Sequence, residues 1–414
     1  MNVLYQVKIA DIWGHLKKED TLFWLINLYM FFEYVRPQYI YPILDFIPYT
    51  QLILIVTTIL FLFTKGIFSV DNAINKLLIL YLTVIILSSF TAFDPGLSFQ
   101  GLEGFLTWLL IYFLIINIIN TEERIFIFLL AFLLYNFKMS FFSLRGWAAT
   151  GFSFSTWGSG GGPGWFSNSG EFGVEMCVFL PLAAYFFIAL RVLWPVWKKT
   201  IFFLFPLSAC TSMVSSSSRG ALIGGAAVVL WMFMKGKHLL RGLLLMVAIA
   251  GFIYMILPEE QKARFEAAGE DKTSLSRMER WEKGLKMAEM YPLLGVGFEN
   301  WSIADTKIFQ GGGGESHNIF IECMSELGYS GLTVFILMIL YTLVNNYRTR
   351  KIAREQLGGN RFFYYMAHGL DGSLIGYLIS GFFVTVLYYP YFWINLAMTV
   401  ALHNSARVEA MRQG

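Results

Sequence analysis

Residues 315–344 read ESHNIFIECMSELGYSGLTVFILMILYTLV, and this stretch joins the most polar part of the chain to one of its apolar runs. Four polar residues come first. The side chains that follow are predominantly apolar over more than the ~20 residues that a helix needs to cross a bilayer core. The stretch therefore predicts a membrane span at 317–344 that carries a histidine, His317, at its mouth.

The rest of the chain has the same apolar character. Its 414 residues are 56% hydrophobic and only 14% charged, whereas a soluble protein carries about 25% charged residues. We therefore predict an all-α integral membrane protein of about twelve transmembrane helices. The predicted spans are 21–36, 49–64, 73–93, 98–118, 124–142, 171–190, 200–215, 219–235, 239–257, 317–344, 366–387 and 390–405.

The composition also excludes other classes of protein. The basic clusters are too short for a nucleic-acid binder. Cys177, Cys210 and Cys323 lie in apolar runs and form neither a disulfide framework nor a zinc pattern, so we expect small buried side chains and no metal site. The polar N-terminus lacks the pattern of a cleaved signal peptide, and residues 3–16 are expected to lie along the membrane surface.

The distribution of positive charge predicts the orientation. With the N-terminus in the cytoplasm, the short outer segments hold only Arg36, Arg145 and Arg219, and the remaining basic clusters lie in inner segments. This asymmetry follows the positive-inside rule, from which long translocated loops are exempt. Both termini are then inside, and Arg36 is expected to reach toward lipid headgroups.

Three regions follow from this topology. Residues 1–257 are expected to form an interfacial segment and spans one to nine. Residues 258–316 are expected to form a large helical loop domain on the outer side. Residues 317–414 are expected to hold the last three spans and the cytoplasmic C-terminus.

A second outer loop, at 150–170, is rich in glycine. Its Trp157 and Trp165 are suited either to stacking on sugars or to anchoring at the headgroups, and the sequence leaves both readings open. Glu171 and Glu175 begin the span that follows. An acid about one turn inside a span needs a partner or water, so Arg145 or Arg219 is a candidate partner.

Arg219 stands among small polar neighbours. It follows four serines at 215–218 and precedes Gly220 and Ala221. Small side chains leave room around a guanidinium, whereas a lipid anchor would sit among aromatics. We therefore expect Arg219 to face a hydrated cavity at the outer surface, where its planar group suits bidentate binding of phosphate.

The outer loop domain contains a second pair of arginines. The capping-box pattern Ser276–Glu279 predicts a helix that begins there and runs to about Tyr291. Arg277 and Arg280 share a face of this helix with Trp281. At the positive end of the helix dipole they would form an anion site. The alternative is a solvated amphipathic helix whose arginines pair with neighbouring glutamates.

His317 is the histidine that the predicted topology places on the same side as these arginines. A base that titrates near neutral pH, beside a cationic phosphate site, can activate a hydroxyl nucleophile. Glu315 or Glu322 is a candidate to orient its imidazole, and the sequence does not choose between them. The other four histidines lie near the predicted inner face.

Five motifs in order resemble the bacterial O-antigen ligase and polymerase superfamily. They are Ser218-Arg-Gly-Ala221, Arg277-x-x-x-Trp281, Tyr291-Pro-Leu-Leu-Gly-Val-Gly-Phe298, Ser316-His-Asn318 and Glu326-Leu-Gly-Tyr-Ser-Gly-Leu332. The motifs cover residues 215–332, and the first half of the chain resembles the family in its layout of spans.

The resemblance implies an inverting, metal-independent glycosyltransferase of the bacterial inner membrane, with its active site in the periplasm and no cofactor. The donor would be a glycan on undecaprenyl diphosphate, and the acceptor a hydroxyl of lipid A-core or a related molecule. His317 would be the base, and Arg219 and Arg277 would hold the diphosphate. We add Arg280 from its place on the helix, and Glu315, Arg145 and Glu171 as supporting residues.

Other functions stay open at this point. An O-antigen or exopolysaccharide polymerase, or a protein O-oligosaccharyltransferase, would use the same site. A transporter of lipid-linked glycans is a more distant alternative, which Glu103 and Lys138 within predicted spans keep open. Such a transporter is expected to show repeated halves, and we find no internal repeat.

Overall fold

The structure is a computed structural model. It describes residues 2–413 apart from 67, 69–71, 154–157, 268 and most of 235–258. The described residues form helices and no strand. The α-helices are α1 (Ile9–Leu16), α2 (Thr21–Tyr34), α3 (Pro37–Ile40), α4 (Tyr49–Lys65), α5 (Ala73–Phe90), α6 (Pro95–Ile118), α7 (Glu122–Ala149), α8 (Ser169–Leu190), α9 (Val196–Ser215), α10 (Arg219–Met234), α12 (Glu259–Glu266), α13 (Lys272–Met290), α14 (Trp301–Phe309), α15 (Ile319–Glu355), α16 (Arg361–Ser380) and α17 (Pro390–Gln413). Short 3-10 helices are η1 (Val3–Gln6), η2 (Pro42–Leu44), η3 (Arg191–Leu193) and η4 (Gly381–Phe383).

The all-helical class is confirmed for the described part of the chain. Among these helices, five are long and apolar enough to cross a membrane: α5, α6, α7, α8 with η3, and α15. Helices α4 and α10 are apolar but shorter. The predicted span 239–257 lies largely outside the described residues, so the count of twelve stays a prediction. Helix α15 is longer than predicted and continues to Glu355.

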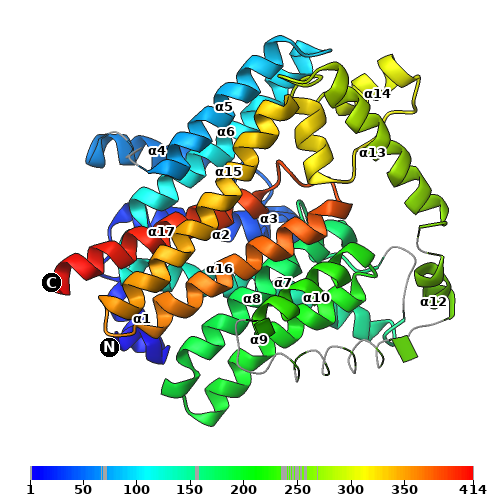
Figure 1. Cartoon of the computed structure of the whole chain (residues 1–414). Helices are drawn as coiled ribbons and strands as arrows, with labels where there is room; N and C mark the ends of the chain where they lie inside the picture. The colour runs from blue at the N-terminus through cyan, green and yellow to red at the C-terminus, as the bar shows by residue number, and fades with distance from the viewer. Residues whose placement is uncertain are drawn as a thin grey trace.

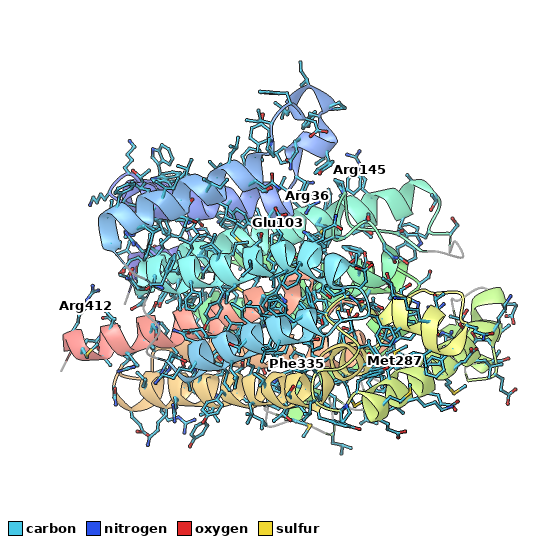
Figure 2. All side chains as sticks on the ribbon, turned by 90° about the horizontal axis from the view of Figure 1, so that it is seen from above. Arg36, Glu103, Arg145, Met287, Phe335 and Arg412 are labelled. Carbon is cyan, nitrogen blue, oxygen red and sulfur yellow. The ribbon has the colours of Figure 1, made fainter. Side chains whose placement is uncertain are left out.

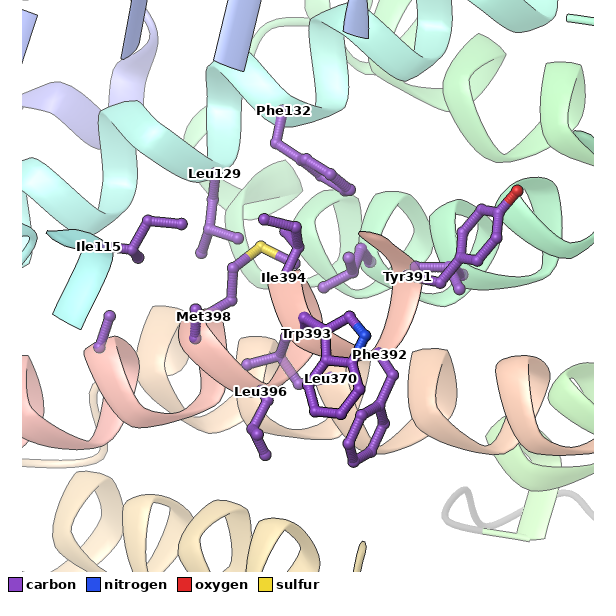
Figure 3. Close-up of a cluster of buried hydrophobic side chains, with 14 of the residues drawn as sticks. Ile115, Leu129, Phe132, Leu370, Tyr391, Phe392, Trp393, Ile394, Leu396 and Met398 are labelled. Atoms are coloured by element: carbon purple, nitrogen blue, oxygen red, sulfur yellow. The ribbon is translucent and has the colours of Figure 1, made fainter. Parts of the chain in front are cut away.

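Helix α17 lies in the middle of the bundle. It packs against α6, α7, α15 and α16. Figure 3 shows its side chains, among them Trp393 and Met398, surrounded by residues such as Ile115 of α6 and Leu129 of α7. The Trp393 ring meets Phe105 edge to face at 5.0 Å between centroids. Between membrane helices, close van der Waals packing of such large side chains stabilises the association of the helices.

Helices α8 and α16 pack closely because small residues line their contact. A Cβ atom on Gly376 would lie 2.5 Å from the Cys177 carbonyl oxygen, and one on Gly372 would lie 2.7 Å from the Pro181 ring. Glycine at such positions lets helix backbones approach, as is common between membrane helices. This packing holds the start of α8 and the end of α16 together.

The helix ends that were predicted to face outward meet at one end of the bundle. The Phe93 N–H donates to the Val296 carbonyl at 3.1 Å, and the Ser159 N–H donates to the Ser215 carbonyl at 2.9 Å. Figure 1 shows α12, α13 and α14 on the side of the molecule opposite the two termini. The polar helices therefore lie over the end of the bundle where the predicted site residues are.

Candidate functional site

Two glycine-containing segments, 291–298 and 325–329, fold against each other. The Val296 N–H donates to the Ser325 carbonyl at 2.8 Å. Gly328, at φ +67°, interrupts the helical geometry of α15 at this contact. Glycine adopts this conformation without a steric cost. Residues 291–298 therefore form a turn that returns the polar segment to the first turns of α15.

A buried carboxylate, that of Glu326, stabilises the joint between segments 291–298 and 325–329. Glu326 accepts hydrogen bonds from the backbone N–H groups of Glu299 and Trp301, both at 3.1 Å. The Tyr388 hydroxyl donates to the same carboxylate at 2.9 Å. A buried carboxylate is costly unless it is hydrogen-bonded, and three donors meet that need here. The role of Glu326 depends on partners distant in sequence, and our sequence reasoning missed it.

Helix α13 begins earlier than the capping-box pattern predicted. Asp271 is its N-cap and accepts from the backbone N–H groups two and three residues further on, both at 3.1 Å. The predicted start at Ser276 is therefore wrong, because an aspartate caps as well as a serine and comes first. Arg277 and Arg280 lie beyond the first turn of the helix. They are therefore not at the positive end of the helix dipole.

Arg219 makes a two-pronged ion pair with Asp271. Its two terminal nitrogens lie 2.9 Å and 3.2 Å from the carboxylate oxygens. The Arg219 guanidinium holds the pKa of Asp271 well below its usual range. This pair joins the start of α10 to the start of α13. The sequence pointed to Arg219, and Asp271 was missed.

Arg277 lies close to these charges without a partner of its own. It makes no hydrogen bond or ion pair to any residue that the structure describes, and its Nε is buried and unsatisfied. Burial lowers its pKa, and repulsion from Arg219 and Arg280 contributes to the same effect. An uncompensated, partly buried guanidinium favours the binding of an anion.

Arg280 holds the segment that follows glycines 311–314 and leads into His317. One terminal nitrogen donates to the Glu315 carbonyl at 2.9 Å. Asp305 of α14 supports the same run, because its carboxylate accepts from the Gly313 N–H at 3.2 Å. Arg280 thus places the 311–316 segment and adds positive charge beside it.

His317 is held by its backbone. It adopts a left-handed conformation at φ +52°, and its N–H donates to the Thr385 hydroxyl at 2.9 Å. The imidazole is 34% exposed, and its Nδ1 lies 3.9 Å from the Glu315 carboxylate. The predicted partner Glu315 is therefore close to the ring, at a distance too long for a hydrogen bond.

The electrostatic surroundings of His317 bring the predicted residues together. Its pKa is lowered to about 4, first by burial and then by Arg277 and Arg280. The imidazole is therefore neutral at pH 7 and able to accept a proton. The structure places His317 and the two arginines of α13 in one electrostatic environment, with Arg219 beside Arg277.

Two predicted supporting residues have other surroundings. Arg145 is exposed on α7, and Figure 2 shows it far from Met287 of α13. Glu171 accepts a hydrogen bond from the Tyr389 hydroxyl at 3.2 Å. Arg145 or Arg219 was predicted as a partner for the acid one turn inside the span, Glu175. Glu175 is buried, and neither of its carboxylate oxygens has a hydrogen-bond partner among the described residues.

The glycine-rich loop is attached to the end of α2. The Trp165 indole donates to Glu33 at 2.5 Å, and Arg36 pairs with the same carboxylate at 2.8 Å. Arg36 is thus engaged with protein and does not reach freely to headgroups. Trp165 also lines a cavity near His317. Trp157 lies outside the described residues.

The fold and the site define a helical membrane protein with a cationic cluster beside a neutral histidine. Residues 180–336 match the model of the O-antigen ligase family. No curated protein matches the chain. The matched segment contains Arg219, Arg277, Arg280 and His317. This match supports the O-antigen ligase superfamily, which implies a glycosyltransferase-like enzyme that acts on lipid-linked glycans.

Proposed function

We propose that the chain transfers a glycan from undecaprenyl diphosphate to an acceptor hydroxyl at the periplasmic face of the inner membrane. The observation that carries this proposal is the unpartnered Arg277 guanidinium next to a neutral His317. The family supports a lipid-linked donor. In this proposal residues 258–316 form the periplasmic domain, and both termini are cytoplasmic.

The arginines would hold the diphosphate. No residue that the structure describes accepts a hydrogen bond from Arg277, so its guanidinium is available to the diphosphate. Arg219 is oriented by its ion pair with Asp271. Guanidinium groups bind phosphate oxygens in pairs. They also stabilise the negative charge that develops on the diphosphate as it leaves, which is commonly the largest electrostatic contribution to such catalysis. Arg280 contributes charge and holds the segment before His317.

His317 would act as the base. It accepts the proton of the acceptor hydroxyl as that oxygen bonds to the anomeric carbon of the donor glycan. The bond from this carbon to the diphosphate oxygen breaks, the electron pair leaves with the diphosphate, and the configuration inverts. A bound diphosphate offsets the charge of the arginines that lower the His317 pKa, so donor binding makes His317 a stronger base.

The same residues would serve a polymerase or a protein O-oligosaccharyltransferase. The acceptor distinguishes these three activities. The structure gives less support to a transporter. Glu103 of α6 and Lys138 of α7 are exposed at the surface of the bundle. Ionisable residues that form a transport path are expected in the interior instead.

The base assignment is tested with His317→Ala in the purified full chain in lipid nanodiscs. We expect transfer from a lipid-linked donor to fall by about 10²–10⁴-fold, the usual contribution of a general base. Binding of undecaprenyl diphosphate should persist, because the arginines are intact. His15→Ala, at the opposite end of the bundle, is the matched control and should leave transfer unchanged. Full transfer by His317→Ala would remove the assignment.

A further inference from the structure

A cavity of about 320 Å³ lies against the segment that leads into His317. This volume is at the lower end of the range for small-molecule pockets, about 300–1,000 Å³. Glu315 and Ser316 form part of its wall, and Thr385, which holds the His317 backbone, forms another part. Helix α6 closes one side at Gly104, where a Cβ atom would meet nothing within 4 Å.

The cavity wall combines carboxylates with aromatic rings. None of its lining residues in the described chain is a lysine, arginine or histidine. The acidic side chains are those of Glu299, Glu315, Glu322 and Glu326, and the large aromatic ones are those of Trp108, Trp165, Trp301, Tyr388 and Tyr389. Carboxyl groups hydrogen-bond to hydroxyls, and flat aromatic faces cover apolar ring surfaces. This surface suits a neutral, hydroxyl-rich ring and offers no cationic side chain to an anion.

Two of these carboxylates are available to a ligand. Glu322 is 6% exposed, and its Oε2 has no hydrogen-bond partner in the part of the chain that the structure describes. A buried oxygen left without a donor is costly, which points to a hydroxyl or water that supplies one. Glu299 lies against α6 because Gly101 leaves space for it, and burial raises its pKa. Glu326, by contrast, is already satisfied within the joint.

A metal ion is the other ligand that clustered carboxylates suggest. The described residues contain no group of three or more acidic, histidine or cysteine side chains placed to hold one. Both oxygens of Glu326 already accept hydrogen bonds from backbone N–H groups or from the Tyr388 hydroxyl. These bonds orient the carboxylate toward the joint. The aromatic rings add nothing to a metal site, whereas they complete a sugar site.

We propose that this cavity binds the acceptor as a neutral sugar ring, with Glu322 accepting hydrogen bonds from its hydroxyls. The inference rests on the proposed function. In an inverting displacement the leaving group and the attacking oxygen lie on opposite sides of the anomeric carbon. The Glu315 carboxylate lies 3.9 Å from the His317 ring and forms part of the cavity wall, and Arg280 contacts the carbonyl of the same residue. The base belongs beside the attacking oxygen, so the cavity receives the acceptor and excludes uronic and other anionic sugars.

The experiment uses the full chain in lipid nanodiscs and two probes that need no identified substrate. The first probe is a panel of methyl glycosides of glucose, galactose, rhamnose and N-acetylglucosamine, with methyl glucuronide as the anionic member, titrated by saturation-transfer NMR. We expect at least one neutral glycoside to bind, and the glucuronide to bind more weakly. Glu322→Gln replaces one carboxyl oxygen with an amide group and should weaken the neutral glycoside about tenfold. Gly104→Leu fills the cavity without removing a hydrogen bond and should abolish binding.

The second probe, undecaprenyl diphosphate, separates this inference from the proposed function. Its binding should be unchanged in both cavity variants and lost in Arg277→Met. Glu103→Gln, on the exposed face of α6, is the matched control and should alter neither probe. If undecaprenyl diphosphate fails to bind while the cavity variants still lose the glycoside, the donor proposal fails and the sugar site stands.

Several outcomes would overturn the sugar site or its role. Absence of binding by every neutral glycoside, or unchanged binding in both cavity variants, would overturn the site. Equal binding of the glucuronide would overturn its charge selectivity. In a transfer assay the cavity variants should raise the KM of the acceptor and leave that of the donor. A rise confined to the donor KM would assign the cavity to the donor glycan instead.

Discussion

Arg124 and Arg277 are two half-buried arginines at opposite ends of the bundle, and their surroundings differ in kind. Arg124 pairs with Glu19 at 2.6 Å and with Asp20 at 2.9 Å, and it also donates to a backbone carbonyl. Arg277 has no such partner among the described residues. The first arrangement ties the N-terminal segment to α7. The second leaves a cation whose energetic cost a ligand is able to offset. An arginine that only stabilises a fold has its hydrogen bonds filled by other residues, whereas one that binds a substrate keeps donors that no residue occupies.

The two arginines provide the prediction with the largest expected effect. Arg277→Met should reduce glycan transfer by about 10²–10³-fold, as the loss of one charge-stabilising donor commonly does. Thermal unfolding should change little, because no intramolecular partner is lost. Arg124→Met should show the reverse: transfer by the folded protein is kept, and unfolding becomes easier by about 2 kcal/mol as two carboxylates lose their partner. The comparison fails if Arg277→Met proves the more destabilising of the two.

The joint that carries the site gives a second, smaller effect. A Cβ atom on Gly328 would lie 2.5 Å from the Leu293 carbonyl carbon, and the glycine has positive φ. Gly328→Ala should therefore cost about 1–3 kcal/mol of stability. It should also lower transfer, because the joint positions the segment before His317. Gly358→Ala is a useful control, since Gly358 also has positive φ but stands in open space and far from the site. Equal losses from both variants would assign the effect to backbone strain alone.

Local sequence patterns predicted the helices and much of the cationic cluster. Apolar runs of sufficient length indicated the helices, and the spacing of Arg277 and Arg280 put both on the face of α13 that turns toward His317. The beginning of α13 was misplaced because Ser276 and Asp271 both suit an N-cap, and local pattern does not rank them. An Asp followed by Lys, Thr and Ser was a usable signal for the earlier start.

Contacts between residues far apart in the chain could not be predicted from local sequence patterns. Arg219 and Asp271 are 52 residues apart, and Glu326 and Tyr388 are 62 apart. Nothing in the local pattern of either residue specifies its partner, because the pairing depends on how the helices pack. The same holds for Glu171. Its observed partner, Tyr389, lies 218 residues away in the linker between α16 and α17.

The smallest predicted effect concerns the acid limb of the pH profile. His317 must be neutral to accept a proton, so activity is expected above its pKa and lost as the pH falls through that value. In the free protein this pKa is about 4, lowered by burial and by Arg277 and Arg280. Removing one cation with Arg280→Met should raise it and move the limb to higher pH, while the imidazole stays neutral at pH 7. An NMR titration of the His317 ring, with the exposed Arg145→Met as control, measures the shift directly. A His317 pKa unchanged in Arg280→Met, or moved equally by Arg145→Met, would show that the α13 arginine does not set the basicity of this histidine. The low pKa of His317 would then be assigned to burial and Arg277.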